Sequence, residues 1–142
     1  MIAAIQNKDG KMSAIHRTYL TNGKKAEVEQ PKKAIGPITP GCAIRLYEIT
    51  DTLGVAEGIE TAIAAHQLFE LPVWSLISAG QMEKFDWPET VKKMIIFADN
   101  DLSFTGQKAA FTLAYRAKSK GLRVRVEIPD RIADWADYVK KV

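Results

Sequence analysis

The sequence is poor in cysteine and has no long apolar run, and both absences limit what the protein can be. Its single cysteine, Cys42, excludes an intramolecular disulfide and a cysteine-built zinc site, and it fits a reducing cytoplasm. No apolar stretch approaches the ~20 residues that a membrane-spanning helix needs, and the N-terminus lacks a signal-peptide pattern. We therefore expect a cytoplasmic protein without a membrane partner.

What the sequence does contain is typical of one globular domain. Of its 142 residues, 46% are hydrophobic and 26% are charged, so the chain can bury a proper core. The net charge of +3 is too small to indicate a partner, but acids dominate residues 51–106 and bases dominate residues 107–131. This distribution suits a protein that holds a cation beside a polyanion, although a solvated helix face explains it more simply.

The N-terminal third of the sequence has the pattern of β structure. Three strands are predicted: 2–6, 12–20 and 43–49. An Asp-Gly hairpin signal joins the first two, and a second hairpin turn falls at 21–24. Residues 31–41 are rich in Gly and Pro and predict a loop. His16 and Arg17 are expected on a solvated strand face, with contact to a phosphate as the alternative. Residues 1–50 as a whole are expected to form a small N-terminal β extension.

From residue 51 onward, strands and helices alternate. The predicted strands are 53–56, 73–77, 94–98 and 124–128. The predicted helices run from Ile59 to the stop at Leu71-Pro72, near 88–93 or just before it, over 106–120 and over 134–140. This order is typical of parallel βαβ units. We therefore predict an α/β domain over residues 51–142, with a Rossmann-like central parallel sheet of about four strands flanked by helices.

Acids and glycines follow three of these strands at their carboxyl ends, where ligands of parallel sheets bind. Glu57-Gly58 follows the first strand, Gly80 the second, and Asp99 and Asp101 the third. Carboxylates gathered in one cleft repel one another unless a cation lies among them, and Mg²⁺ takes such oxygen ligands. Asp-x-Asp alone also forms ordinary turns. The ordered set is a much stronger signal than any single residue.

This ordered set resembles the Toprim domain of primases, topoisomerases and some nucleases. The family carries a Glu after its first strand and an Asp-x-Asp after its third, which match Glu57 and the Asp99/Asp101 pair. Three stretches are similar to the Toprim segment of phage- and plasmid-encoded primases or primase-helicases: VAEGIETAIAA (55–65), IIFADNDLSFTGQKAA (95–110) and DWADYV (134–139). In those proteins a stretch similar to AAIQNKDGKMSAIHRTYL (3–20) commonly precedes the Toprim core.

The resemblance implies nucleotidyl transfer that depends on Mg²⁺ or Mn²⁺, namely primer synthesis on single-stranded DNA from nucleoside triphosphates. It implies Glu57 as general acid/base or metal ligand, Asp99 and Asp101 as metal ligands, and a helicase domain or subunit as a further partner. The sequence departs from some primases at Thr61, where they carry an acid.

One cysteine and 142 residues cannot supply the zinc module and the N-terminal RNA polymerase subdomain of full primases. We therefore expect either a fragment of a larger protein or a short stand-alone Toprim protein.

Two other functions stay open. One is a Toprim nuclease that cuts DNA with Mg²⁺. The other is a non-catalytic module that binds nucleic acid or a replication partner through the N-terminal β extension. A topoisomerase does not fit, because neither the length nor the layout provides a separate domain with a nucleophilic Tyr.

Several residues are candidates for binding a nucleotide or its phosphates. Gly58, Gly80 and Gly106 can let the backbone approach a phosphate closely, although shaping a turn explains each glycine equally well. Lys108 and Arg116, in the helix after the acids, are candidates for phosphate contact.

For other residues a structural role is the simpler interpretation. Asp134 can extend the acidic site, but a role as helix N-cap is sufficient to explain it. His66 and the three tryptophans, Trp74, Trp87 and Trp135, are expected to pack in the core rather than to act on a substrate.

Overall fold

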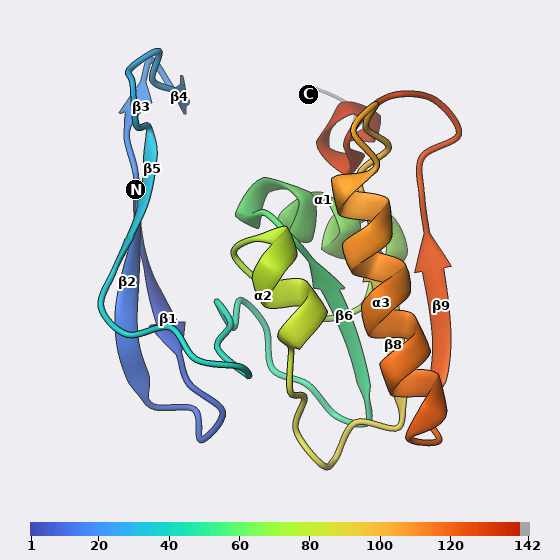
Figure 1. Cartoon of the computed structure of the whole chain (residues 1–142). Helices are drawn as coiled ribbons and strands as arrows, with labels where there is room; N and C mark the ends of the chain where they lie inside the picture. The colour runs from blue at the N-terminus through green and yellow to red at the C-terminus, as the bar shows by residue number, and fades with distance from the viewer. Residues whose placement is uncertain (140–142) are drawn as a thin grey trace.

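A computed structural model describes residues 1–139, in which an antiparallel N-terminal part stands beside a parallel sheet (Figure 1). The parallel sheet has the strand order β7-β6-β8-β9. Its strands are β6 (Thr52–Ala56), β7 (Val73–Ser75), β8 (Lys93–Phe97) and β9 (Arg123–Glu127). The two central strands, β6 and β8, are almost continuously apolar because both of their faces are covered. The predicted α/β fold with four parallel strands is confirmed.

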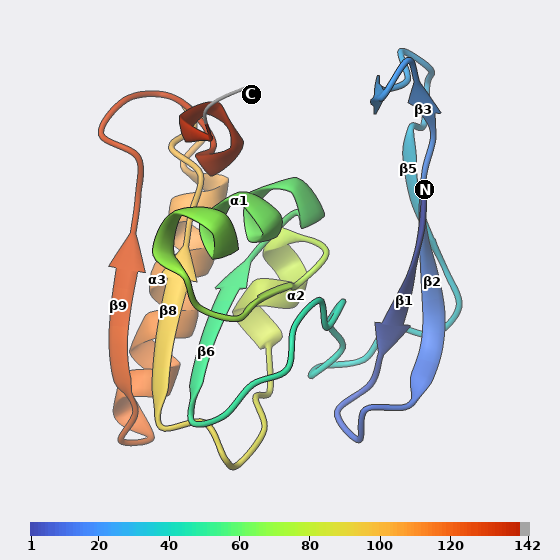
Figure 2. The same ribbon diagram turned by 180° about the vertical axis from the view of Figure 1, so that it is seen from behind.

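Helices cover both faces of this sheet (Figures 1 and 2). Helix α1 (Ile59–Phe69) lies on one face together with the short 3₁₀ helix η1 (Trp135–Tyr138), and α2 (Ala79–Lys84) and α3 (Thr105–Ser119) lie on the other. Each face has its own apolar core. Leu113 and neighbouring alanines of α3 pack in one core, and Ala62 and Ala65 of α1 pack beside Trp135 in the other. None of the helices in residues 1–139 is long and apolar enough to cross a membrane.

The connection from β7 to β8 differs from the sequence prediction. Its helix, α2, begins at Ala79, because Ser78 caps it: the Ser78 side chain accepts a hydrogen bond from the Gln81 N–H at 3.2 Å. Strand β7 consequently ends at Ser75, and Gly80 lies in the first turn of α2 instead of at a strand end. Residues 88–92 are not helical.

The N-terminal part contains the two predicted hairpins. Strands β1 (Ile2–Gln6), β2 (Met12–Thr18) and β5 (Lys32–Ile35) form an antiparallel sheet in the order β1-β2-β5. Strands β3 (Leu20–Thr21) and β4 (Lys24–Lys25) form the second hairpin, whose turn residues Asn22 and Gly23 both have positive φ, as a tight hairpin requires.

Three predictions for this part are wrong. Strand β5 lies in the stretch predicted as loop, because the free edge of β2 supplies hydrogen-bonding partners for it. The predicted strand 43–49 is reduced to two isolated bridges, in which Ala43 pairs with Gln6 of β1 and Ile44 pairs with Ser75 of β7. This segment joins the two sheets instead of extending either. His16 is buried instead of solvated, with 6% of its surface exposed.

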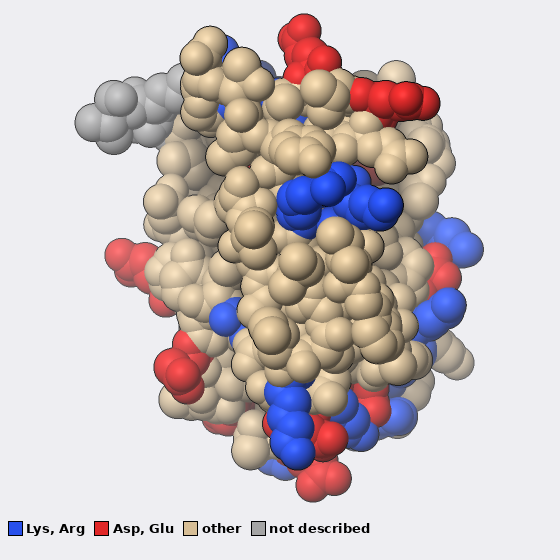
Figure 3. All heavy atoms as spheres, turned by 90° about the vertical axis from the view of Figure 1, so that its left-hand side faces the viewer, with Lys and Arg blue, Asp and Glu red and all other residues tan. Residues whose placement is uncertain are grey.

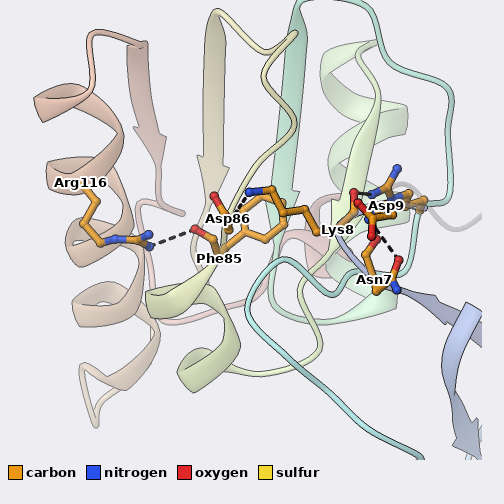
Figure 4. A network of polar contacts seen from close by, with 7 residues as sticks. Asn7, Lys8, Asp9, Phe85, Asp86 and Arg116 are labelled. Atoms are coloured by element: carbon orange, nitrogen blue, oxygen red, sulfur yellow. Dashed lines mark hydrogen bonds and ion pairs between the residues drawn. The ribbon is translucent and has the colours of Figure 1, made fainter. Parts of the chain in front are cut away.

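Polar contacts also hold the first hairpin turn to the rest of the molecule (Figure 4). The Lys8 ammonium lies 2.6 Å from the Asp86 carboxylate, in the segment after α2. Arg45 donates to the backbone carbonyls of Asn7 and Lys8, both at 3.0 Å. On the other side of that segment, Arg116 of α3 donates to the Phe85 carbonyl at 3.0 Å.

Helix η1 lies near the carboxyl edge of the parallel sheet (Figure 1). The helix predicted over 134–140 is a 3₁₀ helix, Trp135–Tyr138, and Lys140 lies outside the described residues.

Candidate functional site

The carboxyl ends of β6 and β8 bring two of the predicted acids to one cavity. Ala56 and Phe97 are in register on these neighbouring parallel strands, so the residues just after them, Glu57 and Asp99, converge. Both line a cavity of about 370 Å³. Glu60 and Asp134 line it as well, so four carboxylates share this space.

The carboxylates in this cavity are crowded. The pKa of Asp99 is raised to about 6, chiefly by burial and also by the negative charges of Asp134, Glu57 and Asp101, while a hydrogen bond from the Thr61 hydroxyl at 3.2 Å opposes the rise. Burial also raises the pKa of Glu57, against a hydrogen bond from the backbone of Ala79. The negative charge at this edge is therefore incompletely neutralised by the protein.

Asp101 lies beside the cavity, at the start of α3. Its carboxylate accepts hydrogen bonds from the Ser103 hydroxyl at 2.6 Å and from the Gly106 N–H at 3.4 Å. The bond from Ser103 is the main reason why the pKa of Asp101 is lowered. Asp101 is still close enough for its charge to raise the pKa of both Glu57 and Asp99.

The C-terminal segment delivers Asp134 to the site through specific hydrogen bonds. The Asn100 and Ala133 backbones pair with each other, and the Asn100 side chain donates to the Pro129 carbonyl at 2.9 Å. The Trp135 indole donates to the Ala98 carbonyl at 3.1 Å. Asp134 is the N-cap of η1, as predicted. No local pattern in the sequence indicates this role of Asn100, because its partner Pro129 lies 29 positions away.

The donors at this edge fit a hard divalent cation, since they are carboxylate oxygens with uncompensated charge. Within residues 1–139, no three Asp, Glu, His or Cys side chains are close enough together to enclose a metal ion by themselves. This agrees with the usual coordination of Mg²⁺, which commonly binds one or two carboxylates and completes its coordination shell with water and substrate phosphates.

The opposite wall of the cavity is basic and comes from the N-terminal part. Lys25 of β4 and Lys32 of β5 line it. The Lys32 ammonium also contacts the Glu60 carboxylate of α1 at 3.0 Å. Sequence reasoning missed both lysines, because it looked for basic partners in residues 107–131. The run of lysines at 24–33 was the available signal.

Comparison with known proteins identifies the family of the part of the chain that forms the parallel sheet. A family model described as Toprim domain matches residues 52–142, which is more than half of the chain. The chain belongs to the Toprim family. A second model, the domain of unknown function DUF7146, matches residues 1–46. Among curated proteins, none is similar enough to the chain to count as a match.

Solved primase structures share the fold of the chain. A DNA primase domain from Pseudomonas aeruginosa has a TM-score of 0.63 at 20% identity, covering 96% of this chain and 45% of that one. The DnaG primase catalytic domain bound to ssDNA has a TM-score of 0.66 at 17% identity, covering 96% and 47%. The structure of bacteriophage T7 lagging-strand DNA polymerase with primase domains of two gp4 subunits has a TM-score of 0.63 at 18% identity, covering 96% of this chain and 69% of that one. The chain thus spans less than half the length of the first and second of these.

The glycines of the Toprim domain are not equivalent. Gly58 lines the cavity at the N-cap of α1. Gly106 lies against Asp101, and a β-carbon added to it would come within 3.1 Å of the Asp101 carboxylate. Gly80, in α2, does not line the cavity and has open space around it.

The two basic candidates of α3 also lie outside the cavity. The Lys108 ammonium is 3.3 Å from the Glu83 carboxylate of α2. Arg116 donates to the backbone carbonyls of Glu83 and Phe85, at 2.7 and 3.0 Å, and so ties α3 to the end of α2.

The residues expected to have structural roles do pack in the Toprim domain. His66 stacks on Tyr47 with ring centroids 3.7 Å apart, and its Nδ1 lies 2.8 Å from the Leu71 carbonyl. The three tryptophans, Trp74, Trp87 and Trp135, are all buried.

Proposed function

We propose that this protein supplies the metal and nucleotide site of a DNA primase, for primer synthesis on single-stranded DNA with Mg²⁺ or Mn²⁺. The observation that carries the proposal is the two-sided cavity, with Glu57 and Asp99 on one wall and Lys25 and Lys32 on the other. A nucleoside triphosphate with its metal ion has the complementary charges. The Toprim family membership and the fold shared with primase domains support the same function.

Each residue has a separate task in this proposal. Asp99 and Asp101 hold the metal ion, which when bound neutralises the triphosphate and orients it for attack. Glu57 either joins them or accepts the proton of the attacking hydroxyl, a task for which a raised pKa makes a carboxylate a stronger base. Thr61 orients Asp99 through its hydrogen bond, and Asp134 adds negative charge facing the ion.

Backbone and basic groups bind the phosphates. Lys25 and Lys32 face the cavity, and the N–H groups that follow Gly58 at the start of α1 add donors for an anion. Gly106 contributes by letting the start of α3 lie against Asp101. Gly80 and Lys108 lie outside the cavity, so they contribute only where a substrate extends over α2 and α3.

Metal binding tests the core of the proposal. Titration with Mg²⁺ or Mn²⁺, followed by NMR or calorimetry, should show binding that Asp99→Asn combined with Asp101→Asn abolishes. Asp9→Asn, in the exposed hairpin turn, is the matched control and should leave binding unchanged. Absence of binding to the wild type, or equal binding by the double variant, contradicts the metal site.

Two activity assays then separate primase from nuclease. Incubation with single-stranded template, nucleoside triphosphates and Mg²⁺ should yield short primers that Glu57→Gln abolishes. Nicking of supercoiled plasmid without primer synthesis identifies a nuclease instead. A protein that binds the metal but does neither is inactive as a separate chain, and the assay is then repeated with the complete parent protein.

A second candidate, a module that docks a replication partner such as a helicase, is favoured by one surface. The outer face of the N-terminal sheet exposes Ile2 by 72% and Ile35 by 46%. Figure 3 shows a broad area without charged side chains on this side. This candidate predicts that Glu57→Gln leaves the biological role intact, whereas Ile2→Lys with Ile35→Lys removes it.

The remaining parts of the proposal concern origin and location. A phage or plasmid origin depends on the sequence likeness of residues 55–65 and 95–110. A cytoplasmic location depends on the single, unpaired Cys42, which is buried. The division into residues 1–50 and 51–142 likewise stays a proposal.

A further inference from the structure

Helix α3 carries a stripe of exposed aromatic side chains on the face turned away from the sheet. Phe111 and Tyr115 are spaced by four residues, which places them on one side of the helix, and Phe104 is the N-cap residue just before its first turn. Their exposed fractions are 68%, 54% and 77%. The opposite side of α3 is packed in the core, so helix packing does not require these aromatics. Exposed aromatics gathered on one element mark a binding surface.

The charged side chains of α3 itself are all basic, while the acids Glu83 and Asp101 lie near the start of the helix. Helix α3 has no acidic residue. Lys108 and Lys118 share the exposed face with the aromatics, and Lys120 and Arg123 follow where the helix ends. Lys108 pairs with Glu83, yet 73% of its side chain remains exposed. The partner that complements this surface is therefore an anion with flat apolar groups.

The spacing along the helix matches a chain of nucleotides. With a rise of ~1.5 Å per residue, Phe111 and Tyr115 are separated by ~6 Å along the helix axis. This distance is on the scale of neighbouring bases in an unstacked strand. Bases stack on exposed aromatic side chains, while lysines beside them neutralise the phosphates. A duplex offers no free base faces for this contact.

The stripe also begins at the candidate site. Helix α3 starts next to Asp101, whose carboxylate accepts the Gly106 N–H. Figure 1 shows α3 running from the carboxyl edge of the parallel sheet down to the opposite edge. A strand that lies on α3 is thereby led to or from the cavity.

We propose that Phe104, Lys108, Phe111, Tyr115 and Lys118, here called the α3 stripe, bind single-stranded nucleic acid by base stacking. This surface is separate from the acidic cavity and needs neither a metal ion nor a nucleoside triphosphate. It therefore goes beyond the proposed reaction, and its binding can be measured without it.

Fluorescence anisotropy with labelled oligo-dT, at low salt and with EDTA, tests the α3 stripe. Phe111→Leu combined with Tyr115→Leu keeps an apolar, helix-compatible surface but removes the ring faces. It should weaken binding about tenfold or more, because each stacked base contributes substantially. Tyr115→Phe should bind as the wild type does, and Leu68→Ala, at an exposed position of α1, is the matched control.

The same series distinguishes this proposal from its alternatives. Asp99→Asn with Asp101→Asn removes two negative charges and should not weaken the binding of oligo-dT, whatever the fate of the catalytic proposal. The proposal is overturned if the double leucine variant binds oligo-dT as tightly as the wild type. It is also overturned if the leucine substitutions weaken the binding of duplex DNA as much as that of oligo-dT, because charge alone then explains the binding. A wild-type dimer that the leucine variant loses in sedimentation also overturns it. So does binding to anionic vesicles in place of oligo-dT. Circular dichroism confirms that each variant is folded.

Discussion

Asp99 is the residue at which burial and function conflict most directly. Thr61 supplies one hydrogen bond, but burial and three neighbouring acids disfavour the ionised carboxylate, so its pKa rises to about 6. A polar residue placed there for stability alone would not be crowded in this way. Perturbed carboxylates in a cleft are typical of sites that bind a cation or move a proton.

This conflict predicts how stability depends on pH. The folded pKa of Asp99, about 6, lies above its ordinary value of 3.8. The ionised Asp99 carboxylate therefore destabilises the folded protein. This destabilisation is absent at low pH, develops as the pH rises from about 4 to about 6, and is constant above that. Asp99→Asn should raise the unfolding free energy of the metal-free protein at pH 7 by ~1–3 kcal/mol, since each pKa unit corresponds to about 1.4 kcal/mol.

Thermal unfolding in EDTA at pH 7 and at pH 4 measures this effect. The difference in stability by which Asp99→Asn exceeds the wild type should be smaller at pH 4 than at pH 7. Added Mg²⁺ should stabilise the wild type and not the variant. A variant that is less stable than the wild type at pH 7 without metal contradicts the crowding of negative charge inferred for Asp99.

At the scale of elements, the N-terminal strands are bound to the parallel sheet by a shared core rather than by charge. Ile5 of β1 is fully buried and packs in one cluster with Ile44 and with Ile59 of α1. The Lys8–Asp86 ion pair joins the same two parts, but it lies at the surface, where water and salt screen it (Figure 4).

Ile5→Ala should therefore lower the unfolding free energy by ~2–5 kcal/mol, as expected for a large-to-small change in a packed core. Lys8→Ala should change it little. Urea denaturation followed by tryptophan fluorescence and by far-UV circular dichroism measures both. Because the core is shared, the two signals should change together in the wild type. Two separate transitions would show that residues 1–50 fold as an independent unit.

The succession of strands and helices along residues 51–142 could largely be predicted, since buried strands and capped helices leave local patterns. The elements that were mispredicted are those whose structure depends on a distant partner. Strand β5 forms because β2 offers it an edge, and Ala43 and Ile44 each pair with a different sheet. Helix α2 was misplaced for another reason, because its start depends on the Ser78 cap, a local signal that went unrecognised.

At the scale of the whole molecule, the cavity exists because two parts of the chain meet. Acids from the parallel sheet form one wall, and lysines from the N-terminal strands form the other. Neither part alone presents both charges to a substrate. The lysines that face the cavity alternate with lysines that do not, because successive strand residues point to opposite sides.

This alternation provides an unusually close control. Lys25→Gln with Lys32→Gln should weaken the binding of a Mg²⁺–nucleoside triphosphate about tenfold, whereas Lys24→Gln with Lys33→Gln, which removes the same charge from neighbouring positions, should change it less than about twofold. Calorimetry or a fluorescent nucleotide measures both. Equal effects of the two pairs would mean that general charge, and not the wall of the cavity, attracts the nucleotide.

The sequence by itself determined the α/β class, the four parallel strands and the positions of Glu57, Asp99 and Asp101 at strand ends, because hydrophobic periodicity and strand order are local and repeated signals. Only the tertiary structure decided that Asp134 joins them, that Asp101 lies beside the cavity, and that Lys25 and Lys32 form the opposite wall. These facts depend on contacts between residues far apart in the chain. Such contacts follow from how the packed elements fit together in space, which no short stretch of sequence records.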